Sequence, residues 1–414
     1  MFENEVKTER ALLIVLDTGE YDAESSLSEL SELVKTAGAD PAFTLTQKRP
    51  APDTATCLGS GMAQEAASLI ARDELDLAVF DRELTPTQIR NLEQLFDVRV
   101  IDRTMLILDI FAQRAQSREG KLQVELAQLR YLLPRLSGQG TAMSRLGAGI
   151  GTRGPGETKL ETDRRHIRRR IGNLKEKLEE VKENRAVLSR HREKTGVVTV
   201  ALVGYTNAGK STLMNRLTQA GVLAEDKLFA TLDPTARALK LPCGKTVMLI
   251  DTVGLLRRLP HHLVDAFRST LEEAAAADIL LNICDASSPE ATEHLRVTEE
   301  LLQTLRTGDR PVIPVLNKWD MVEDPDFAPQ PPGAVRISAK TGEGIDALLA
   351  AVEAALPEKT FDVELLLPFA KSGLAAMLRE EGAVLSEEYV PEGLRVKARV
   401  DERLFAKVKE FEVQ

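Results

Sequence analysis

Along the first 116 residues, the hydrophobic positions change repeatedly between two periodicities. Short apolar runs predict buried strands, and stretches with apolar residues three and four positions apart predict amphipathic helices between them. The predicted strands are Leu12–Leu16, Leu75–Phe80 and Val98–Ile101, and the predicted helices are Ser26–Thr36, Met62–Arg72, Thr85–Leu95 and Thr104–Gln116. Strands that alternate with helices are typical of a small sheet with flanking helices. We therefore expect an N-terminal α/β domain at residues 1–116.

Residues 117–195 carry a different pattern, in which leucine and isoleucine recur at spacings of three and four residues. Such heptad spacing predicts helices that pack along a continuous apolar seam. One seam comprises Leu122, Leu126, Leu129, Leu133 and Leu136, and the other comprises Ile167, Ile171, Leu174, Leu178, Val181 and Leu188. Because a glycine-rich link separates the seams, they predict an antiparallel helical hairpin. Pro134 is expected to kink the first helix or to end its regular part.

The rest of the chain predicts two further domains. Between residues 196 and 358, four strand-like runs that are each followed by polar residues predict a mostly parallel sheet. These runs are Val197–Val203, Val247–Ile250, Val312–Leu316 and Val335–Ile337. Two strand-like runs and a helical stretch then predict a small C-terminal α+β domain at residues 359–414. Those segments are Val363–Leu367, Leu374–Glu381 and Leu394–Val400.

The first of the four runs leads into a glycine-rich motif, G-x-x-x-x-G-K-[ST], and a helical pattern follows. Strand, glycine loop and helix form the context of a phosphate-binding P-loop, in which backbone N–H groups and the helix N-terminus surround the phosphates. Lys210 would reach the β- and γ-phosphates, and the Ser211 hydroxyl would bind Mg²⁺. The predicted nucleotide-binding residues of this motif are Gly204, Tyr205, Thr206, Asn207, Ala208, Gly209, Lys210, Ser211 and Thr212.

A second motif closes the next apolar run, and its residues are predicted to adjoin the nucleotide. They are Asp251, Thr252, Val253 and Gly254. A carboxylate at a strand end beside the P-loop holds Mg²⁺, which makes Asp251 a predicted metal ligand. Leu255 follows, where Ras-like GTPases place a glutamine that orients the attacking water. Because leucine cannot polarise water, we expect slow intrinsic hydrolysis that a partner, an ion or another residue accelerates.

Two later motifs indicate which base is bound. The first comprises Asn317, Lys318, Trp319 and Asp320, and the second comprises Ser338, Ala339 and Lys340. A carboxylate in the first motif can accept two N–H bonds from guanine, which adenine cannot supply in that pattern. An unpaired buried acceptor costs about 1–3 kcal/mol, so this motif selects GTP over ATP. The order and spacing of all four motifs resemble the G1, G3, G4 and G5 elements of translation-factor-type GTPases.

Between the first helix and the next strand of this domain lies the segment expected to act as switch I. Its threonine must present a hydroxyl to Mg²⁺ and an N–H to the γ-phosphate, and Thr231 and Thr235 are both available. In the P-loop, Asn207 either helps to hold a K⁺ ion beside the phosphates or is a plain turn asparagine. The predicted nucleotide-binding residues of switch I are Phe229, Ala230, Thr231, Leu232 and Asp233.

Charge is unevenly distributed along the chain. Residues 117–195 contain 19 Lys and Arg against 10 Asp and Glu, a net charge of +9, whereas the whole chain carries −10. A solvated helix face is one interpretation of this cluster, but five arginines within seven residues beside a glycine-rich link favour contact with RNA phosphates. The predicted RNA-binding residues are Arg153, Lys159, Arg164, Arg165, Arg168, Arg169 and Arg170.

Apolar run lengths, the first residues and the cysteines indicate where in the cell the protein acts. No apolar run reaches the ~18 residues that a membrane-spanning helix needs, and the first residues lack the features of a signal peptide. Cys57, Cys243 and Cys284 are far apart and lack metal-ligand spacing, which is typical of reduced thiols. We expect a monomeric, cytoplasmic protein with no integral membrane segment and no metal site beyond Mg²⁺.

Several blocks of the sequence together resemble the HflX family of GTPases. Besides the nucleotide motifs, the similar segments are Asp102–Ala112, Lys121–Leu129, Arg153–Thr158, Leu160–Arg165, Phe229–Thr235 and Leu259–His261. The resemblance runs from about residue 10 to the C-terminus, and its switch I spacing favours Thr231. It implies a GTPase that binds the large (50S) ribosomal subunit near its rRNA, splits stalled ribosomes under stress and controls subunit assembly.

One segment departs from the pattern of this family. Met62 follows Gly59-Ser60-Gly61, where the family usually carries a lysine, so a basic contact by that loop is not expected. The resemblance also implies that the ribosome activates a site that has Leu255 in place of glutamine. A GTP-timed RNA chaperone or a ribosome assembly factor without splitting activity remains an alternative.

Overall fold

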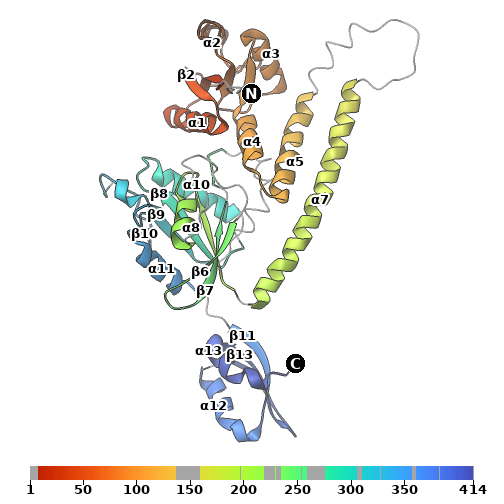
Figure 1. The fold of residues 1–414 in the computed structure, drawn as a ribbon, viewed down its shortest axis with the longest axis vertical. Helices are drawn as coiled ribbons and strands as arrows, with labels where there is room; N and C mark the ends of the chain where they lie inside the picture. Colours follow the sequence, from red (N-terminus) through yellow and green to blue (C-terminus); the bar gives the residue numbers. More distant parts are fainter. Residues whose placement is uncertain are drawn as a thin grey trace, which may run out of the picture.

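Figure 1 shows a chain built from an N-terminal α/β part, a two-helix hairpin, a larger central domain and a small C-terminal domain, which is the architecture predicted from the sequence. The computed structural model describes residues 8–136, 159–195, 197–218, 229, 235–252, 254–258, 276–304, 310–326, 328–356, 360–381 and 383–413. The domain boundaries at residues 116, 195 and 358 stay a prediction from the sequence.

The N-terminal part contains a four-stranded parallel sheet with the strand order β2-β1-β3-β4. Its elements are β1 (Arg10–Asp17), α1 (Ala23–Ala37), β2 (Asp40–Lys48), α2 (Ser60–Asp73), β3 (Leu77–Phe80), α3 (Pro86–Phe96) and β4 (Arg99–Asp102). The sequence pattern did not predict β2, a half-exposed edge strand with a proline at its second position. The strand order reverses between β1 and β3, and parallel sheets bind ligands at the carboxyl ends that flank such a switch point.

Three helices follow this sheet: α4 (Arg103–Arg114), α5 (Arg118–Arg135) and α7 (Lys159–Thr195). Helices α5 and α7 lie side by side, which confirms the predicted hairpin (Figure 1). Its buried seam contains Leu126, Ile171 and Leu174, flanked by half-buried members of the two predicted repeats. Pro134 stands in the last turn of α5, so the helix ends there as expected. With 37 residues against 18, α7 extends well beyond its partner.

The central domain holds a six-stranded sheet in the order β10-β9-β8-β5-β7-β6, in which only β6 runs antiparallel to its neighbour. The strands are β5 (Thr199–Gly204), β6 (Thr235–Lys240), β7 (Thr246–Asp251), β8 (Ile279–Asp285), β9 (Val312–Asn317) and β10 (Val335–Arg336), and the described helices are α8 (Lys210–Thr218), α10 (Ala291–Thr304) and α11 (Ile345–Ala354). The predicted mostly parallel sheet is therefore confirmed. Strands β6 and β8 were not predicted, although β8 is almost entirely apolar and buried.

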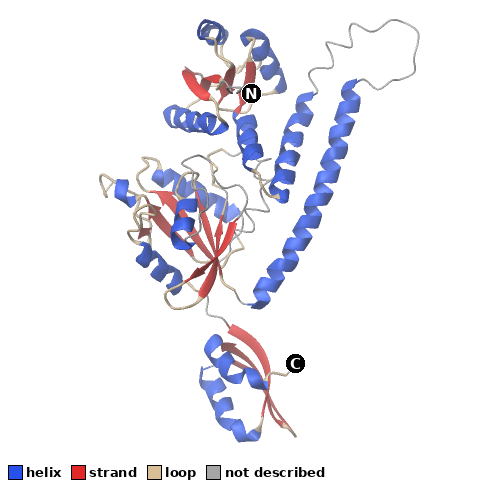
Figure 2. Ribbon diagram, viewed as in Figure 1, coloured by secondary structure: helices blue, strands red, loops and turns tan. Residues whose placement is uncertain are grey.

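The C-terminal domain is a separate sheet in Figure 2, with helices packed on it. Three antiparallel strands have the order β11-β13-β12. Its elements are β11 (Thr360–Leu367), α12 (Ser372–Glu381), β12 (Ala383–Val390), β13 (Gly393–Asp401) and α13 (Glu402–Val408). The α+β prediction is confirmed, with β12 and α13 as additions. Among the helices that the structure describes, none is long and apolar enough to cross a membrane.

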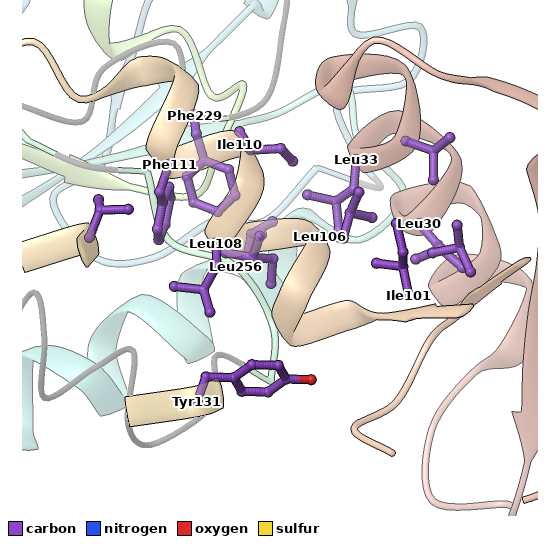
Figure 3. Packing of buried hydrophobic residues seen from close by; sticks show 14 of the residues in the cluster. Leu30, Leu33, Ile101, Leu106, Leu108, Ile110, Phe111, Tyr131, Phe229 and Leu256 are labelled. Atoms are coloured by element: carbon purple, nitrogen blue, oxygen red, sulfur yellow. The ribbon is translucent and has the colours of Figure 1, made fainter. Parts of the chain in front are cut away.

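One hydrophobic core joins the N-terminal part to the central domain. Helices α1, α4 and α5 supply most of its side chains, and Tyr205, Phe229 and Leu256 of the central domain complete it. The rings of Phe111 on α4 and Phe229 meet edge to face, with their centroids 4.6 Å apart (Figure 3). This shared core fixes the N-terminal part against the residues that surround the predicted nucleotide site.

Candidate nucleotide-binding site

The P-loop connects β5 to α8 at the centre of the six-stranded sheet, as the motif requires. Two of its glycines allow close backbone approaches that a side chain would block. A Cβ atom on Gly204 would lie 2.1 Å from the carbonyl oxygen of Ile283, and one on Gly209 would lie 2.2 Å from Asn317 Nδ2. Asn207 has a φ of 60°, a left-handed conformation that asparagine tolerates well. That conformation accounts for an asparagine at position 207 without any ion.

Lys210 is buried, and its ammonium group is held by the P-loop backbone. Its Nζ atom donates to the carbonyl oxygens of Gly204 at 3.0 Å and Tyr205 at 2.8 Å. Burial lowers the pKa of Lys210 to about 8, and the charge of Asp251 opposes this shift. A buried cation whose partners are neutral carbonyls is well placed to pair with a phosphate instead.

Two predicted metal ligands already lie together. The Ser211 hydroxyl donates to Asp251 Oδ2 at 2.8 Å, and Asp251 is completely buried at the end of β7. Next to it, the Thr252 hydroxyl donates to the carbonyl oxygen of Leu202 at 2.6 Å, which fixes the chain after the strand. A hydroxyl and a carboxylate are hard oxygen ligands of the kind that Mg²⁺ prefers, so these residues fit the predicted ion.

The chain after β7 is paired with the P-loop. The Thr206 N–H donates to the carbonyl oxygen of Leu255 at 2.8 Å, and the Leu255 N–H donates to the carbonyl oxygen of Gly204 at 3.1 Å. Gly254 lies so close that a Cβ atom there would be 2.6 Å from Thr206 Cγ2. The Leu255 side chain is itself buried. Switch II, defined here as the described residues 254–258, therefore starts in direct contact with the phosphate loop.

Asn317 connects the P-loop to both base-recognition segments. Its Nδ2 donates to the carbonyl oxygen of Ala208 at 2.7 Å, and its Oδ1 accepts the Ala339 N–H at 2.9 Å. Lys318 has a left-handed φ of 58° and pairs with Asp285 at 2.7 Å. The Asp320 side chain, two residues further on, is exposed.

The structure thus brings most of the predicted nucleotide-binding residues together at the carboxyl edge of the sheet. These are Gly204, Tyr205, Thr206, Asn207, Ala208, Gly209, Lys210, Ser211, Thr212, Asp251, Thr252, Gly254, Asn317, Lys318, Trp319, Asp320, Ser338, Ala339 and Lys340. Five others fall outside the described residues: Ala230, Thr231, Leu232, Asp233 and Val253.

Two predicted nucleotide contacts have side chains that point elsewhere. Phe229 is buried against Phe111 in the interdomain core, so only its backbone could meet a nucleotide. Tyr205 is also buried, and its hydroxyl donates to Glu29 of α1 at 2.9 Å. Both residues therefore link the nucleotide site to the N-terminal part, which the sequence motifs did not indicate.

The predicted RNA-binding residues lie on the first half of α7 as far as the structure describes them. Arg168, Arg169 and Arg170 are exposed, and Arg170 pairs with Glu125 of α5 at 2.6 Å. Arg164 is half-buried and Arg165 is exposed. Arg153 and the side chain of Lys159 fall outside the described residues. The exposed arginines form a basic surface on a helix that otherwise carries charges of both signs.

Three family models match consecutive parts of the chain. They are described as GTP-binding GTPase N-terminal at residues 24–112, GTP-binding GTPase Middle Region at residues 114–192, and 50S ribosome-binding GTPase at residues 199–318. Together they cover most of the N-terminal part, the hairpin and most of the central domain.

Curated proteins similar to this chain carry the name GTPase HflX. The protein of Lacrimispora saccharolytica is 50% identical over 405 residues, which cover 96% of this chain and 95% of the relative. The Escherichia coli protein is 45% identical over 376 residues, which cover 89% and 88% of the two chains. Among solved structures, a GTP-binding protein from Sulfolobus solfataricus in complex with GDP has 23% identity and a TM-score of 0.46, covering 84% of this chain and 98% of its own.

Proposed function

The chain belongs to the HflX family of GTPases, with a 50S ribosome-binding GTPase domain at residues 199–318, and we propose that it uses GTP to split or rescue stalled ribosomes. The observation that carries this proposal is the contact between the nucleotide site and the part of the molecule that bears the hairpin. Tyr205 of the P-loop and residues of switch II reach the N-terminal part, on which α5 also packs. GTP binding and hydrolysis can therefore act on the basic helix α7 through contiguous elements.

The proposed roles at the nucleotide follow from the positions described above. Lys210 exchanges its two carbonyl partners for β- and γ-phosphate oxygens, and Asp320 accepts the guanine N–H groups. Gly254 offers its backbone N–H to the γ-phosphate, and Thr231 supplies the switch I hydroxyl. Mg²⁺, held by Ser211, Asp251 and Thr231, would neutralise charge that develops on the phosphates when it is bound. A K⁺ ion at Asn207 remains a second proposal for additional charge compensation.

With a buried leucine at position 255, no side chain there can orient water. We therefore propose slow intrinsic hydrolysis that the 50S subunit accelerates. Arg168 and Arg169 on α7 are proposed to contact rRNA phosphates, together with Arg153, Lys159, Arg164, Arg165 and Arg170. The protein would act as a monomer in the cytoplasm, where ribosomes are found.

The decisive experiment measures GTP hydrolysis with and without purified 50S subunits and, in parallel, the sedimentation of 70S ribosomes. We expect strong stimulation by 50S and conversion of 70S particles to subunits in the presence of a non-hydrolysable GTP analogue. Stimulated hydrolysis with intact 70S would refute splitting and favour an assembly factor. Unchanged hydrolysis and intact 70S would refute both and favour a GTP-timed RNA chaperone.

Two variants separate the nucleotide site from the RNA surface. Lys210→Ala should abolish GTP and GDP binding. Replacing both Arg168 and Arg169 by glutamine should leave GTP binding unchanged and weaken 50S association, with a shallower dependence on salt. A matched control is Arg379→Gln in the C-terminal domain, because Arg379 is an exposed arginine that pairs with Glu387. Equal 50S affinity of the double variant and the control at all salt concentrations would eliminate the RNA role.

A further inference from the structure

The carboxyl ends of β3 and β4 each lead into a buried aspartate, Asp81 and Asp102. Buried carboxylates are costly unless charged or hydrogen-bonding partners surround them. Both aspartates have such partners, but the partners come from different parts of the molecule. Asp81 is paired with switch II of the central domain, whereas Asp102 is paired with helix α5 of the hairpin.

On the Asp81 side, an arginine of switch II enters the N-terminal part. Arg258 Nη2 donates to Asp81 Oδ2 at 2.7 Å and to the Ser26 hydroxyl. Its guanidinium group lies 3.9 Å from the centre of the Tyr21 ring, which follows β1. Tyr21, Ser26 and Asp81 surround the switch point between β1 and β3, so Arg258 occupies the place where a parallel sheet binds a ligand.

Arg103 and Tyr205 hold the preceding residue of switch II. Arg103 is almost fully buried and pairs with both Asp81, at 2.7 Å, and Glu29. The same guanidinium donates to the carbonyl oxygen of Arg257 at 3.3 Å, while the N–H of Arg257 donates to the Tyr205 hydroxyl at 2.8 Å. Both backbone groups of residue 257 are therefore bonded to side chains that meet at Glu29.

On the other side, Asp102 holds the hairpin. It accepts hydrogen bonds from the Tyr131 hydroxyl and from Arg135 Nη2, the latter at 3.1 Å, and both donors lie on α5. The Arg135 guanidinium also covers the Tyr131 ring at 3.2 Å. Asp102 is at the same time the N-cap of α4, since it accepts the Met105 N–H at 2.9 Å. Its carboxylate thus fixes α5 to the first turn of α4.

Asp102 and Arg103 are consecutive residues at the start of α4, so one short segment holds the hairpin with one side chain and switch II with the next. The opposite end of α4 contacts the segment that contains switch I, through Phe111 and Phe229 (Figure 3). Switch II and the segment that contains switch I therefore both contact α4, a helix of 12 residues on which α5 packs.

We propose that Asp102 and Arg103 are positioning residues that transmit the state of switch II to the hairpin. When GTP reorders switch II, the Arg257 and Arg258 contacts change, Arg103 and α4 shift with them, and Asp102 carries α5 along. The proposal rests on the switch mechanism of the proposed function and adds the residues that do the coupling.

The test compares hydrogen exchange of the α5 backbone, at residues 118–135, with GDP and with a non-hydrolysable GTP analogue. It uses the full-length protein without ribosomes, so that failure of this coupling is distinguishable from failure of ribosome splitting. Arg258→Gln removes the ion pair with Asp81, and because the Arg258 side chain is half-exposed we expect the variant to fold. Tyr131→Phe removes one hydroxyl and leaves Asp102 with its other donors. Binding of fluorescent GDP verifies that each variant is folded.

In the wild type we expect exchange in α5 to differ at least fivefold between the two nucleotides. Each single variant should reduce this difference to less than twofold, and the double variant should lose no more than the larger single effect, because both act in one chain of contacts. Arg296→Gln is the matched control, since Arg296 lies beside this interface and pairs with Glu293 and Glu300 of its own helix. It should behave as the wild type.

Three results would overturn the proposal. They are a wild type whose α5 exchange is independent of the nucleotide, single variants that keep the full difference, and a double variant whose effects add. If Tyr131→Phe bound GDP poorly, Arg135→Gln would replace it, because glutamine removes the cation that pairs with Asp102 and leaves the Tyr131 hydroxyl in place. The same three criteria would then apply.

Discussion

Replacing Asn317 by alanine tests whether the P-loop and the base-recognition segments form one unit. Asn317 is buried, and its amide is the hydrogen-bond partner of the Ala208 carbonyl and the Ala339 N–H. Alanine supplies neither partner, and both backbone groups belong to buried residues. Each buried group left unpaired costs about 1–3 kcal/mol, so the two together cost about 2–6 kcal/mol.

This cost divides between folding and nucleotide binding, and both are measurable. For a domain of this size, about 2 kcal/mol lowers the melting temperature by at least about 4 °C. The part of the cost that falls on nucleotide binding weakens that binding about tenfold for every 1.4 kcal/mol. We therefore expect Asn317→Ala to bind GDP at least about tenfold more weakly in a fluorescence titration. Asn317→Asp should be no better, because its carboxylate would face the Ala208 carbonyl oxygen.

Asn91→Ala provides the matched control, because the half-exposed Asn91 amide donates to the Ala55 carbonyl oxygen at 3.0 Å in the N-terminal part. That variant should change stability by less than about 0.5 kcal/mol and leave GDP affinity unchanged. If Asn317→Ala matched the control in both melting temperature and GDP affinity, the two segments would not depend on Asn317 for their arrangement.

Further predictions concern switch II, the domain interface and the bound ions. Gly254→Ala should lower the rate of GTP hydrolysis at least about tenfold and leave GDP affinity within a few-fold, because its methyl group would lie 2.6 Å from Thr206 Cγ2; Gly61→Ala, where a methyl group meets open space, should have no effect on hydrolysis. Burial, and secondarily Arg257, lowers the pKa of His294 to about 4, against weaker opposing effects of Glu290, Asp285 and Glu293. The unfolded chain therefore binds a proton at pH ~6.5 that the folded chain does not, and the free energy of unfolding should fall by at most about 3 kcal/mol between pH ~6.5 and ~4. Denaturant titrations of the wild type and of His294→Gln would check this, since the variant should lose that slope. If Asn207 holds K⁺, GTP hydrolysis should be faster in K⁺ than in Na⁺, and equal rates would dismiss the ion.

The nucleotide site could be predicted from the sequence because each of its parts is local. A P-loop needs a strand, a glycine loop and a helix in immediate succession, and Gly204 to Ser211 supply them without reference to the rest of the chain. The edge strand β2 shows the opposite case. Its alternation at Phe43 and Leu45 is only half-buried, and polar neighbours interrupt it, so the pattern did not stand out from a loop.

The contacts between the N-terminal part and switch II could not be predicted, because they join residues that are far apart in the sequence. Glu29 and Tyr205 are separated by 176 positions, and Asp81 and Arg258 by 177. Charged residues usually lie in solvent, so a sequence gives no reason to bury Asp81 or Arg103 until a partner is known. Asp102-Arg103-Thr104 is part of the family resemblance, but the sequence indicates no chemical role for these residues.

In the structure, Asp102 pairs with the hairpin and Arg103 with switch II, which contains Leu255. Leu255 cannot orient water, so we expect the rate of hydrolysis to depend on how switch II is held. Switch II here is held by the P-loop through Gly204 and Thr206, and by the N-terminal part through Arg103 and Asp81. A partner that displaces the N-terminal part or the hairpin must therefore alter switch II. If the proposed coupling holds, binding of the ribosome and binding of GTP must favour each other by the same factor. A faster hydrolysis would then follow from the altered position of switch II and would need no contact between the ribosome and the nucleotide.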